Sequence, residues 1–109
     1  PKGTEIIVVG EGEKFSFTPS NPWVAVGWRS AADVQIEVRP YLAKKQIGFV
    51  ATGCAKVEAA ENRLLLKDGT TLSYDYLVIA TGPRLAFDEV PGLGPAAHTQ
   101  SVCTTSHAL

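Results

Sequence analysis

Three short apolar runs, rich in β-branched residues, constrain what this sequence can fold into. They occupy residues 4–10, 47–52 and 76–81, and each ends at or just before a glycine. A run of this length and composition is typical of a strand buried on both faces, as in a parallel sheet. The third run leads into Thr81-Gly82-Pro83, a turn of small residues. Ligands of open α/β sheets lie beyond the carboxyl ends of strands, so this turn is predicted to contact a ligand.

Turn and breaker residues divide the rest of the chain. Glu61-Asn62 and Asp68-Gly69 split residues 55–75 into three stretches, and Asp-Gly between apolar runs strongly predicts a hairpin. A three-stranded antiparallel meander is therefore expected there, which makes the fold class α/β with an antiparallel appendage. Residues 20–28 predict an irregular loop that two tryptophans anchor, and residues 82–100 predict a loop broken by proline and glycine.

Proline and threonine positions predict two helices. The first begins near Glu37 and has Pro40 in its first turn, where the missing N–H leaves no hydrogen bond unmade. The second is expected to begin within residues 99–109, with Thr104 or Thr105 as its N-cap.

Composition excludes several classes of function. The 109 residues have a net charge of −1, which gives no reason to expect nucleic acid as a partner, and no apolar run is long enough to cross a bilayer. Two cysteines and two histidines at these spacings match no zinc template, so no metal site is expected. The cysteines are expected to be reduced and half-buried; a disulfide stays open, because sequence does not place their Cα atoms.

A complete phosphate-binding loop is not found in the sequence. A doubly wound nucleotide-binding fold begins with a strand, a G-x-G-x-x-G loop and a helix. Residues 10–14, GEGEK, hold two glycines without the third, and the residues that follow do not begin a helix. The stretch is better interpreted as the end of the second strand of such a fold, where Glu11 or Glu13 would hold a ribose. A solvated turn glutamate is the alternative.

Three motifs then give a resemblance to a known family. They are PSNPWVAVGW at residues 19–28, YDYLVIATGPRLAFDEVPGLGP at residues 74–95 and QSVCTTSHA at residues 100–108. Together they resemble the sulfide:quinone oxidoreductases, within the flavoproteins that have two dinucleotide-binding domains. The Ala-Thr-Gly turn is shared by many flavin and NAD(P) reductases, whereas the first and third motifs are much more specific. The resemblance covers essentially the whole chain.

The resemblance implies a piece of a longer enzyme. Residues 1–109 would be a single partial Rossmann-like FAD-binding domain that lacks its first strand and glycine-rich loop and carries the antiparallel meander. Two further redox cysteines, a second dinucleotide-binding domain and a membrane-binding region are expected beyond residue 109. The 109-residue chain alone is therefore expected to be soluble, without FAD and inactive. Its exposed sheet edge predicts a dimer or a domain-swapped assembly.

The resemblance also implies which residues bind FAD. They are Pro19, Asn21, Gly53, Cys54, Ala80, Thr81, Gly82 and Pro83. Prolines suit a loop beside the flavin because they fix the backbone and expose no stray donor, although packing of the two tryptophans explains the same loop. Gly82 has no Cβ, so its backbone can approach a ligand closely; a tight turn needs glycine too. The main chain at Gly53 would pass the adenine, and the Cys54 side chain is expected to be structural.

Cys103 and His107 are the candidate catalytic residues. Cys103 aligns with one of three redox cysteines of the family, and a thiolate is the form of cysteine that attacks sulfur. In some members this position bonds to the flavin instead, so both roles stay open. His107 lies four residues later and would relay protons, while an exposed histidine without a role is the alternative. The family usually has an acidic residue just before this histidine, where this chain has Ser106.

The function implied is oxidation of sulfide to sulfur or polysulfide, with electrons passing through a cysteine–flavin adduct to FAD and then to quinone. The partners are sulfide and quinone as substrates and a membrane surface, which the full-length protein would bind peripherally. The alternative is a type II NADH dehydrogenase or a flavoprotein like flavocytochrome c sulfide dehydrogenase. An NADH-binding glycine loop outside these residues would favour that alternative, whereas two further cysteines would favour sulfide.

Overall fold

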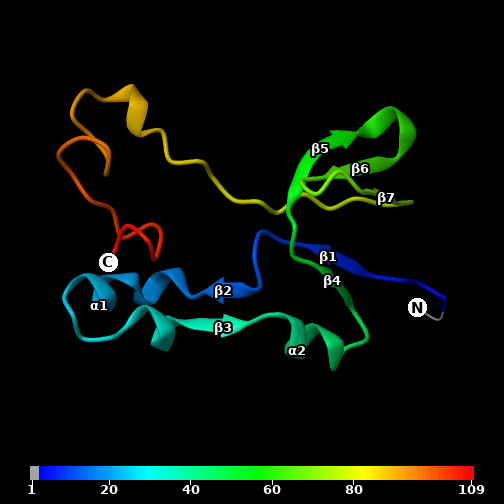
Figure 1. Ribbon diagram of the computed structural model, residues 1–109, viewed down its shortest axis with the longest axis horizontal. Coiled ribbons are helices and arrows are strands. Elements are labelled where there is room, and N and C mark those ends of the chain that lie inside the picture. The colour runs from blue at the N-terminus through cyan, green and yellow to red at the C-terminus, as the bar shows by residue number, and fades with distance from the viewer. Residues whose placement is uncertain (1–2) are drawn as a thin grey trace. The chain divides into compact units, whose positions relative to one another are not determined.

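The computed structural model describes residues 3–109, which form two compact units (Figure 1). The first unit contains the chain up to Lys14 together with Glu37–Ala80. The second unit contains Phe15–Ile36 and Thr81–Leu109. The expectation that residues 1–109 form a single partial FAD-binding domain stays a prediction.

A parallel pair of strands begins the first unit. Strand β1 (Ile7–Val9) pairs with strand β4 (Gly48–Val50), with Ile7 opposite Gly48 and Val9 opposite Val50. The parallel direction confirms the prediction from the first two apolar runs. The expectation of burial on both faces is wrong for β1: Ile7 and Val9 are half-buried, whereas Val8 is exposed. Alternate residues of a strand point to opposite faces, so only one face of β1 is covered.

Helix α2 (Arg39–Ala43) packs against β4 and is held there by one arginine. Pro40 lies in the first turn, as predicted, but the helix begins after Glu37 because Gln35–Glu37 form strand β3. The Arg39 guanidinium donates to both carboxylate oxygens of Glu13, at 2.6 and 3.2 Å, and to the backbone oxygen of Phe49 at 3.1 Å. This fork ties the helix to the chain after β1 and to β4.

The predicted meander is confirmed as a three-stranded antiparallel sheet (Figure 1). Its strands are β5 (Cys54–Glu58), β6 (Arg63–Leu66) and β7 (Thr71–Ser73). Both turns contain the residues that predicted them. Asn62 adopts the left-handed conformation at φ 49°, and the Asp68 carboxylate accepts hydrogen bonds from the N–H and hydroxyl of Thr70, at 2.9 and 2.6 Å. Leu64 and Leu66 are buried. The local turn chemistry therefore sets the register.

The second unit corrects the loop expected over residues 20–28. Residues Thr18–Ser20 form a 3-10 helix that continues into helix α1 (Asn21–Ala25), which has a proline in its first turn. Proline is favoured there because its N–H would have no intrahelical partner, so the residue that suggested a loop begins a helix instead. A second 3-10 helix (Ala31–Val34) follows, and strand β2 (Lys14–Ser16) pairs with β3.

The strand expected over residues 76–81 is not present. Tyr76 is 94% exposed and Val78 is 87% exposed. Within residues 3–109, no hydrogen bond of any kind involves residues 75–85. A strand exists through its ladder to a neighbour, and no described strand pairs with this run. The apolar pattern predicted a buried strand, but the burial and the pairing that would make it one are absent from the residues described.

The last part of the second unit is mostly irregular, as predicted for residues 82–100, with one 3-10 turn at Phe87–Glu89. The helix expected within residues 99–109 is reduced to a single turn, in which the Ala108 N–H donates to the Thr104 oxygen at 3.2 Å. The Thr104 hydroxyl accepts from the His107 N–H at 3.3 Å, so Thr104 caps this turn. Among the described residues, no helix has the length and apolar character needed to span a bilayer.

We expect the stability of the meander to depend on pH through Glu58. Its carboxylate accepts a hydrogen bond from Arg63 Nε at 2.8 Å, and this bond is the main reason that the Glu58 pKa lies below its ordinary value of 4.5. A lowered folded-state pKa stabilises the fold above the unfolded pKa, and that contribution is lost as pH falls through the folded pKa. Glu58→Gln should therefore lose less unfolding free energy than the wild type between about pH 6 and about pH 3 in urea titrations.

Glu61→Gln is the matched control, because Glu61 has no side-chain partner among residues 3–109. Its pH dependence should equal that of the wild type. Equal acid sensitivity of the wild type and Glu58→Gln would contradict the prediction.

Candidate functional site

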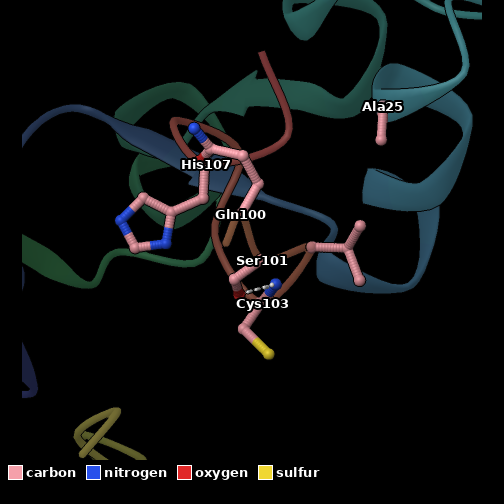
Figure 2. Close-up of a pocket in the computed structure, with 6 residues that line it drawn as sticks. Ala25, Gln100, Ser101, Cys103 and His107 are labelled. Atoms are coloured by element: carbon pink, nitrogen blue, oxygen red, sulfur yellow. Dashed lines mark hydrogen bonds between the residues drawn. The ribbon is translucent and has the colours of Figure 1, made fainter. Parts of the chain in front are cut away.

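The two candidate catalytic residues lie at one pocket of the second unit. The pocket has a volume of about 450 Å³ and is formed by the end of α1 and the segment before the C-terminus (Figure 2). Its lining residues are Ala25, Gln100, Ser101, Val102, Cys103 and His107. The structure therefore brings Cys103 and His107 together, as the sequence predicted from their spacing of four residues.

The segment that carries Cys103 is anchored to α1 by a buried asparagine. Asn21 is 0% exposed. Its Nδ2 donates to the backbone oxygen of Val102 at 2.9 Å, and its Oδ1 accepts from the Thr105 hydroxyl at 3.0 Å. Ala108 adds an apolar contact, because it forms a buried cluster with Val24 and Val34. The chain on both sides of Cys103 is thus attached to the helix.

Cys103 is a free, exposed cysteine, and a hydrogen bond of its backbone N–H fixes its position in the segment. Its N–H donates to the Ser101 hydroxyl at 2.9 Å, which Figure 2 shows as a dashed line. No charged side chain lines the pocket. Within residues 3–109 no hydrogen bond joins the thiol to His107, and in Figure 2 the two side chains leave the segment in different directions. The thiol is accessible to a substrate but is not paired with a base in this structure.

His107 presents an unused ring nitrogen. Its imidazole packs at a tilt against Phe87, with the ring centroids 5.6 Å apart. The Nδ1 atom is buried and has no hydrogen-bond partner among the described residues. Buried polar atoms are nearly always paired in native proteins, so an unpaired one marks a place for a further group or a proton. This nitrogen is the one feature of His107 that favours a chemical role over a passive one.

The Ala80-Thr81-Gly82-Pro83 turn is exposed and conformationally suited to a close approach. Gly82 has φ 73°, and nothing lies within 4 Å of the position that a Cβ would occupy. The N–H groups of Thr81 and Gly82 make no backbone hydrogen bonds within residues 3–109 and are available, whereas Pro83 has no N–H. These observations fit a cofactor-binding wall, and contact with FAD stays a prediction. The same holds for Pro19, which is exposed in the 3-10 helix before α1.

Gly53 and Cys54 form hydrogen bonds within the first unit. The Gly53 N–H donates to the Gly10 oxygen at 2.9 Å, and its oxygen accepts from the Lys67 N–H at 3.1 Å. Both main-chain groups are therefore engaged within the protein, and the predicted adenine contact stays a prediction. The exposed Cys54 thiol donates to the Lys56 oxygen at 3.5 Å and to the Leu65 oxygen at 3.8 Å. A structural role for this thiol is the simpler account.

Both candidate ribose-binding glutamates are ion-paired. Glu13 is held by Arg39 and Glu11 by Lys67. Their positions match the alternative of a turn glutamate, with the addition of a cationic partner that the sequence did not indicate. Within residues 3–109, no group of three or more histidine, cysteine or acidic side chains could hold a metal ion.

Sequence reasoning missed two residues of the site. Thr105 was considered only as a helix cap, and its hydroxyl instead bonds Asn21 across 84 positions of the chain. Ala25 was not considered and forms a wall of the pocket. The available signal was a polar Asn21 at the start of the apolar stretch Pro22-Trp23-Val24-Ala25, where a buried amide requires partners.

The chain is similar in sequence to known proteins. No family model matches the sequence. The chain is 35% identical, over 96% of its length, to the sulfide-quinone reductase of Aquifex aeolicus (strain VF5), and 33% identical, over 82%, to the mitochondrial sulfide:quinone oxidoreductase of Dictyostelium discoideum. It is 27% identical, over 86%, to the mitochondrial external alternative NAD(P)H-ubiquinone oxidoreductase B1 of Solanum tuberosum.

The structural comparison agrees. The X-ray structure of the sulfide:quinone oxidoreductase from Aquifex aeolicus matches 95% of this chain at a TM-score of 0.83. The chain covers 24% of that structure, and 24% and 20% of the two sulfide-oxidising relatives. It therefore spans about a quarter of the length of these proteins.

Fold and sequence place the chain among the flavoprotein quinone oxidoreductases. Within that class it is a homologue of the sulfide:quinone oxidoreductases, as its three motifs indicated.

Proposed function

We propose that the full-length protein oxidises sulfide to sulfur or polysulfide and transfers the electrons through FAD to quinone. The observation that carries the proposal is the shared pocket of Cys103 and His107 in a homologue of the sulfide:quinone oxidoreductases. The exposed Cys103 thiol can reach a small anion such as hydrosulfide. No charged side chain in the lining repels it.

The chain's own residues supply a sulfur atom that hydrosulfide can attack and a proton acceptor. A disulfide between Cys103 and a second cysteine would be attacked by hydrosulfide, which breaks the S–S bond, forms a new S–S bond and releases one thiolate. The proton of hydrosulfide then needs an acceptor, and the unpaired Nδ1 of His107 is available in the same pocket. This exchange leaves the two electrons lost by sulfide on the released thiolate, and FAD, when bound, would supply the acceptor for them. Cys103 would act in sulfur transfer or bond to the flavin.

The exposed turn at residues 80–83 would form part of the FAD site. An unhindered Gly82 backbone and unpaired neighbouring N–H groups are the features that allow close contact with a planar ring system. Pro19 would add a rigid neighbour without a donor, and Gly53 and Cys54 would contribute through their main chain.

The alternative is an NADH-dependent quinone reductase, which the potato relative represents. Two observations support sulfide instead. Identity to the two sulfide-oxidising relatives is 35% and 33%, against 27% to that relative. Oxidation of NADH by hydride transfer also gives no role to a thiol at the pocket.

The assay of sulfide-dependent quinone reduction by the full-length protein tests this function. Cys103→Ala should lower kcat by at least about tenfold, and His107→Phe by a similar factor, because each removes a reacting group. Ser73→Ala, in the exposed strand β7, is a control that should keep wild-type activity. Oxidation of NADH without any response to sulfide would overturn the proposal in favour of the alternative.

Gly82→Ala tests the FAD site. A Cβ at φ 73° costs about 1 kcal/mol of conformational strain, and it also occupies the space through which the cofactor would pass. We expect FAD affinity, measured by flavin absorbance in titrations of the full-length protein, to fall by about tenfold or more. Gly69→Ala is the matched control, since Gly69 has φ 85° and equally open surroundings in the β6–β7 turn. Equal loss of FAD in both variants would show that strain alone is responsible.

We further propose that the 109-residue chain by itself binds no FAD and self-associates. The support is the unpaired apolar run at residues 76–81 and a parallel sheet of only two strands among the residues described. Such edges invite pairing with another chain, as a dimer or a domain-swapped assembly. Light scattering should give at least the mass of a dimer, and absorbance should show no flavin. A monomer, or a yellow protein, would contradict this.

Peripheral membrane binding is proposed only for the full-length protein, where a lipid-soluble quinone must be reached.

A further inference from the structure

We propose that Asn21 and Thr105 are positioning residues, which fix the Cys103 thiol in the orientation that sulfur chemistry requires. The inference rests on the function proposed above. In this proposal Asn21 acts by positioning Cys103, whereas the sequence predicted that Asn21 contacts FAD directly.

Backbone hydrogen bonds hold the segment that carries the thiol only at its end, where the Thr104 and Thr105 oxygens accept from the Ala108 N–H, both at 3.2 Å. Across residues 100–107, no N–H donates to a backbone oxygen. The segment is instead shaped by side chains: Ser101 accepts from the Cys103 N–H, Thr104 accepts from the His107 N–H, and Asn21 bonds on both sides of Cys103. The first two bonds are local, with partners two or three residues apart. Among the side-chain hydrogen bonds of the segment, those of Asn21 attach it to another element of the unit, and the His107 ring adds packing against Phe87.

The two Asn21 bonds bracket the cysteine. The Val102 oxygen, which accepts from Asn21 Nδ2, belongs to the residue just before Cys103. The Thr105 hydroxyl, which donates to Asn21 Oδ1, belongs to the residue two positions after it. Because the amide plane is rigid, both attachment points are fixed relative to α1 and to each other. The backbone direction at Cys103 is set by this pair of bonds.

Burial makes the arrangement specific. The Asn21 side chain is 0% exposed, so each of its polar atoms that lost its partner would stay desolvated. Thr105 is also buried, so an apolar side chain in place of Asn21 would leave the Thr105 hydroxyl without its partner. What the amide adds is direction, because hydrogen bonds constrain angle and register as well as distance.

Separate apolar contacts keep the segment docked. Ala108 is buried with Val24 and Val34, and these contacts do not involve the amide. Removing the Asn21–Thr105 bond should therefore loosen residues 102–105 without detaching them. Displacement of a reacting group by about 1 Å can lower a rate by about a hundredfold, so such loosening should be visible in catalysis.

The decisive variants are Thr105→Val, which keeps the shape of the side chain and removes its hydroxyl, and Thr105→Ser, which keeps the hydroxyl. Thr71→Val in strand β7 is the matched control for the same chemical change at an exposed site. A nitroxide spin label attached to Cys103 in the 109-residue chain reports the mobility of the segment directly, and a label on Cys54 serves as an internal reference. In the full-length protein, kcat for sulfide-dependent quinone reduction is measured alongside the flavin content.

We expect Thr105→Val to increase the mobility of the Cys103 label, to leave the Cys54 label unchanged and to lower kcat by at least about tenfold at unchanged flavin content. Thr105→Ser should behave as the wild type in both measurements, and Thr71→Val should do the same. A Cys103 label as immobile in Thr105→Val as in the wild type would overturn the proposal. So would an equal fall of kcat in Thr105→Ser.

The Asn21→Ala/Thr105→Val double variant adds a second test, by urea unfolding. Since Asn21→Ala already removes the shared bond, the second substitution should cost little more unfolding free energy; full additivity would contradict the bond. Absence of sulfide-dependent activity in the wild type would overturn the proposed function alone, because label mobility still shows whether Asn21 and Thr105 position Cys103.

Discussion

A buried amide is the interaction on which the candidate site depends. Asn21 lies at the start of a five-residue helix, and its two hydrogen bonds join that helix to residues more than 80 positions away. Without them, the segment around Cys103 would be held by local turns, by Ala108 and by the packing of His107 on Phe87. The two hydrogen bonds offset the desolvation of the buried Asn21 amide, and their partners lie on both sides of Cys103. This interaction therefore maintains the pocket between α1 and the segment.

The opposite situation is found at residues 76–81. There the side chains have strong strand propensity, yet the described chain supplies no neighbour to complete the ladder. Propensity for a strand mostly measures how well a side chain fits a half-buried, pleated surface, so it has little effect where no such surface forms. The free backbone groups that result are also what makes the following Gly82 turn available to a ligand.

Local chemistry explains which parts of the fold were predictable. The Asp68-Gly69 turn, the turn at Glu61-Asn62 and Pro40 in a first helical turn each depend on one or two neighbouring residues, and all three were confirmed. The helix at Asn21–Ala25 was missed because proline marks both loops and first turns, and only its surroundings distinguish them. The Arg39–Glu13 and Lys67–Glu11 pairs were missed because they join residues 26 and 56 positions apart.

The same division applies to the site. Motifs within the sequence determined the family resemblance, the presence of Cys103 and His107 in one short segment and the small-residue turn at Gly82, because each is encoded by residues close together in the chain. Tertiary structure decided that Asn21 turns inward to Val102 and Thr105, and that His107 keeps an unpaired nitrogen. Those outcomes depend on which distant atoms exclude water from a polar group, and burial is a property of the packed chain rather than of any segment of it.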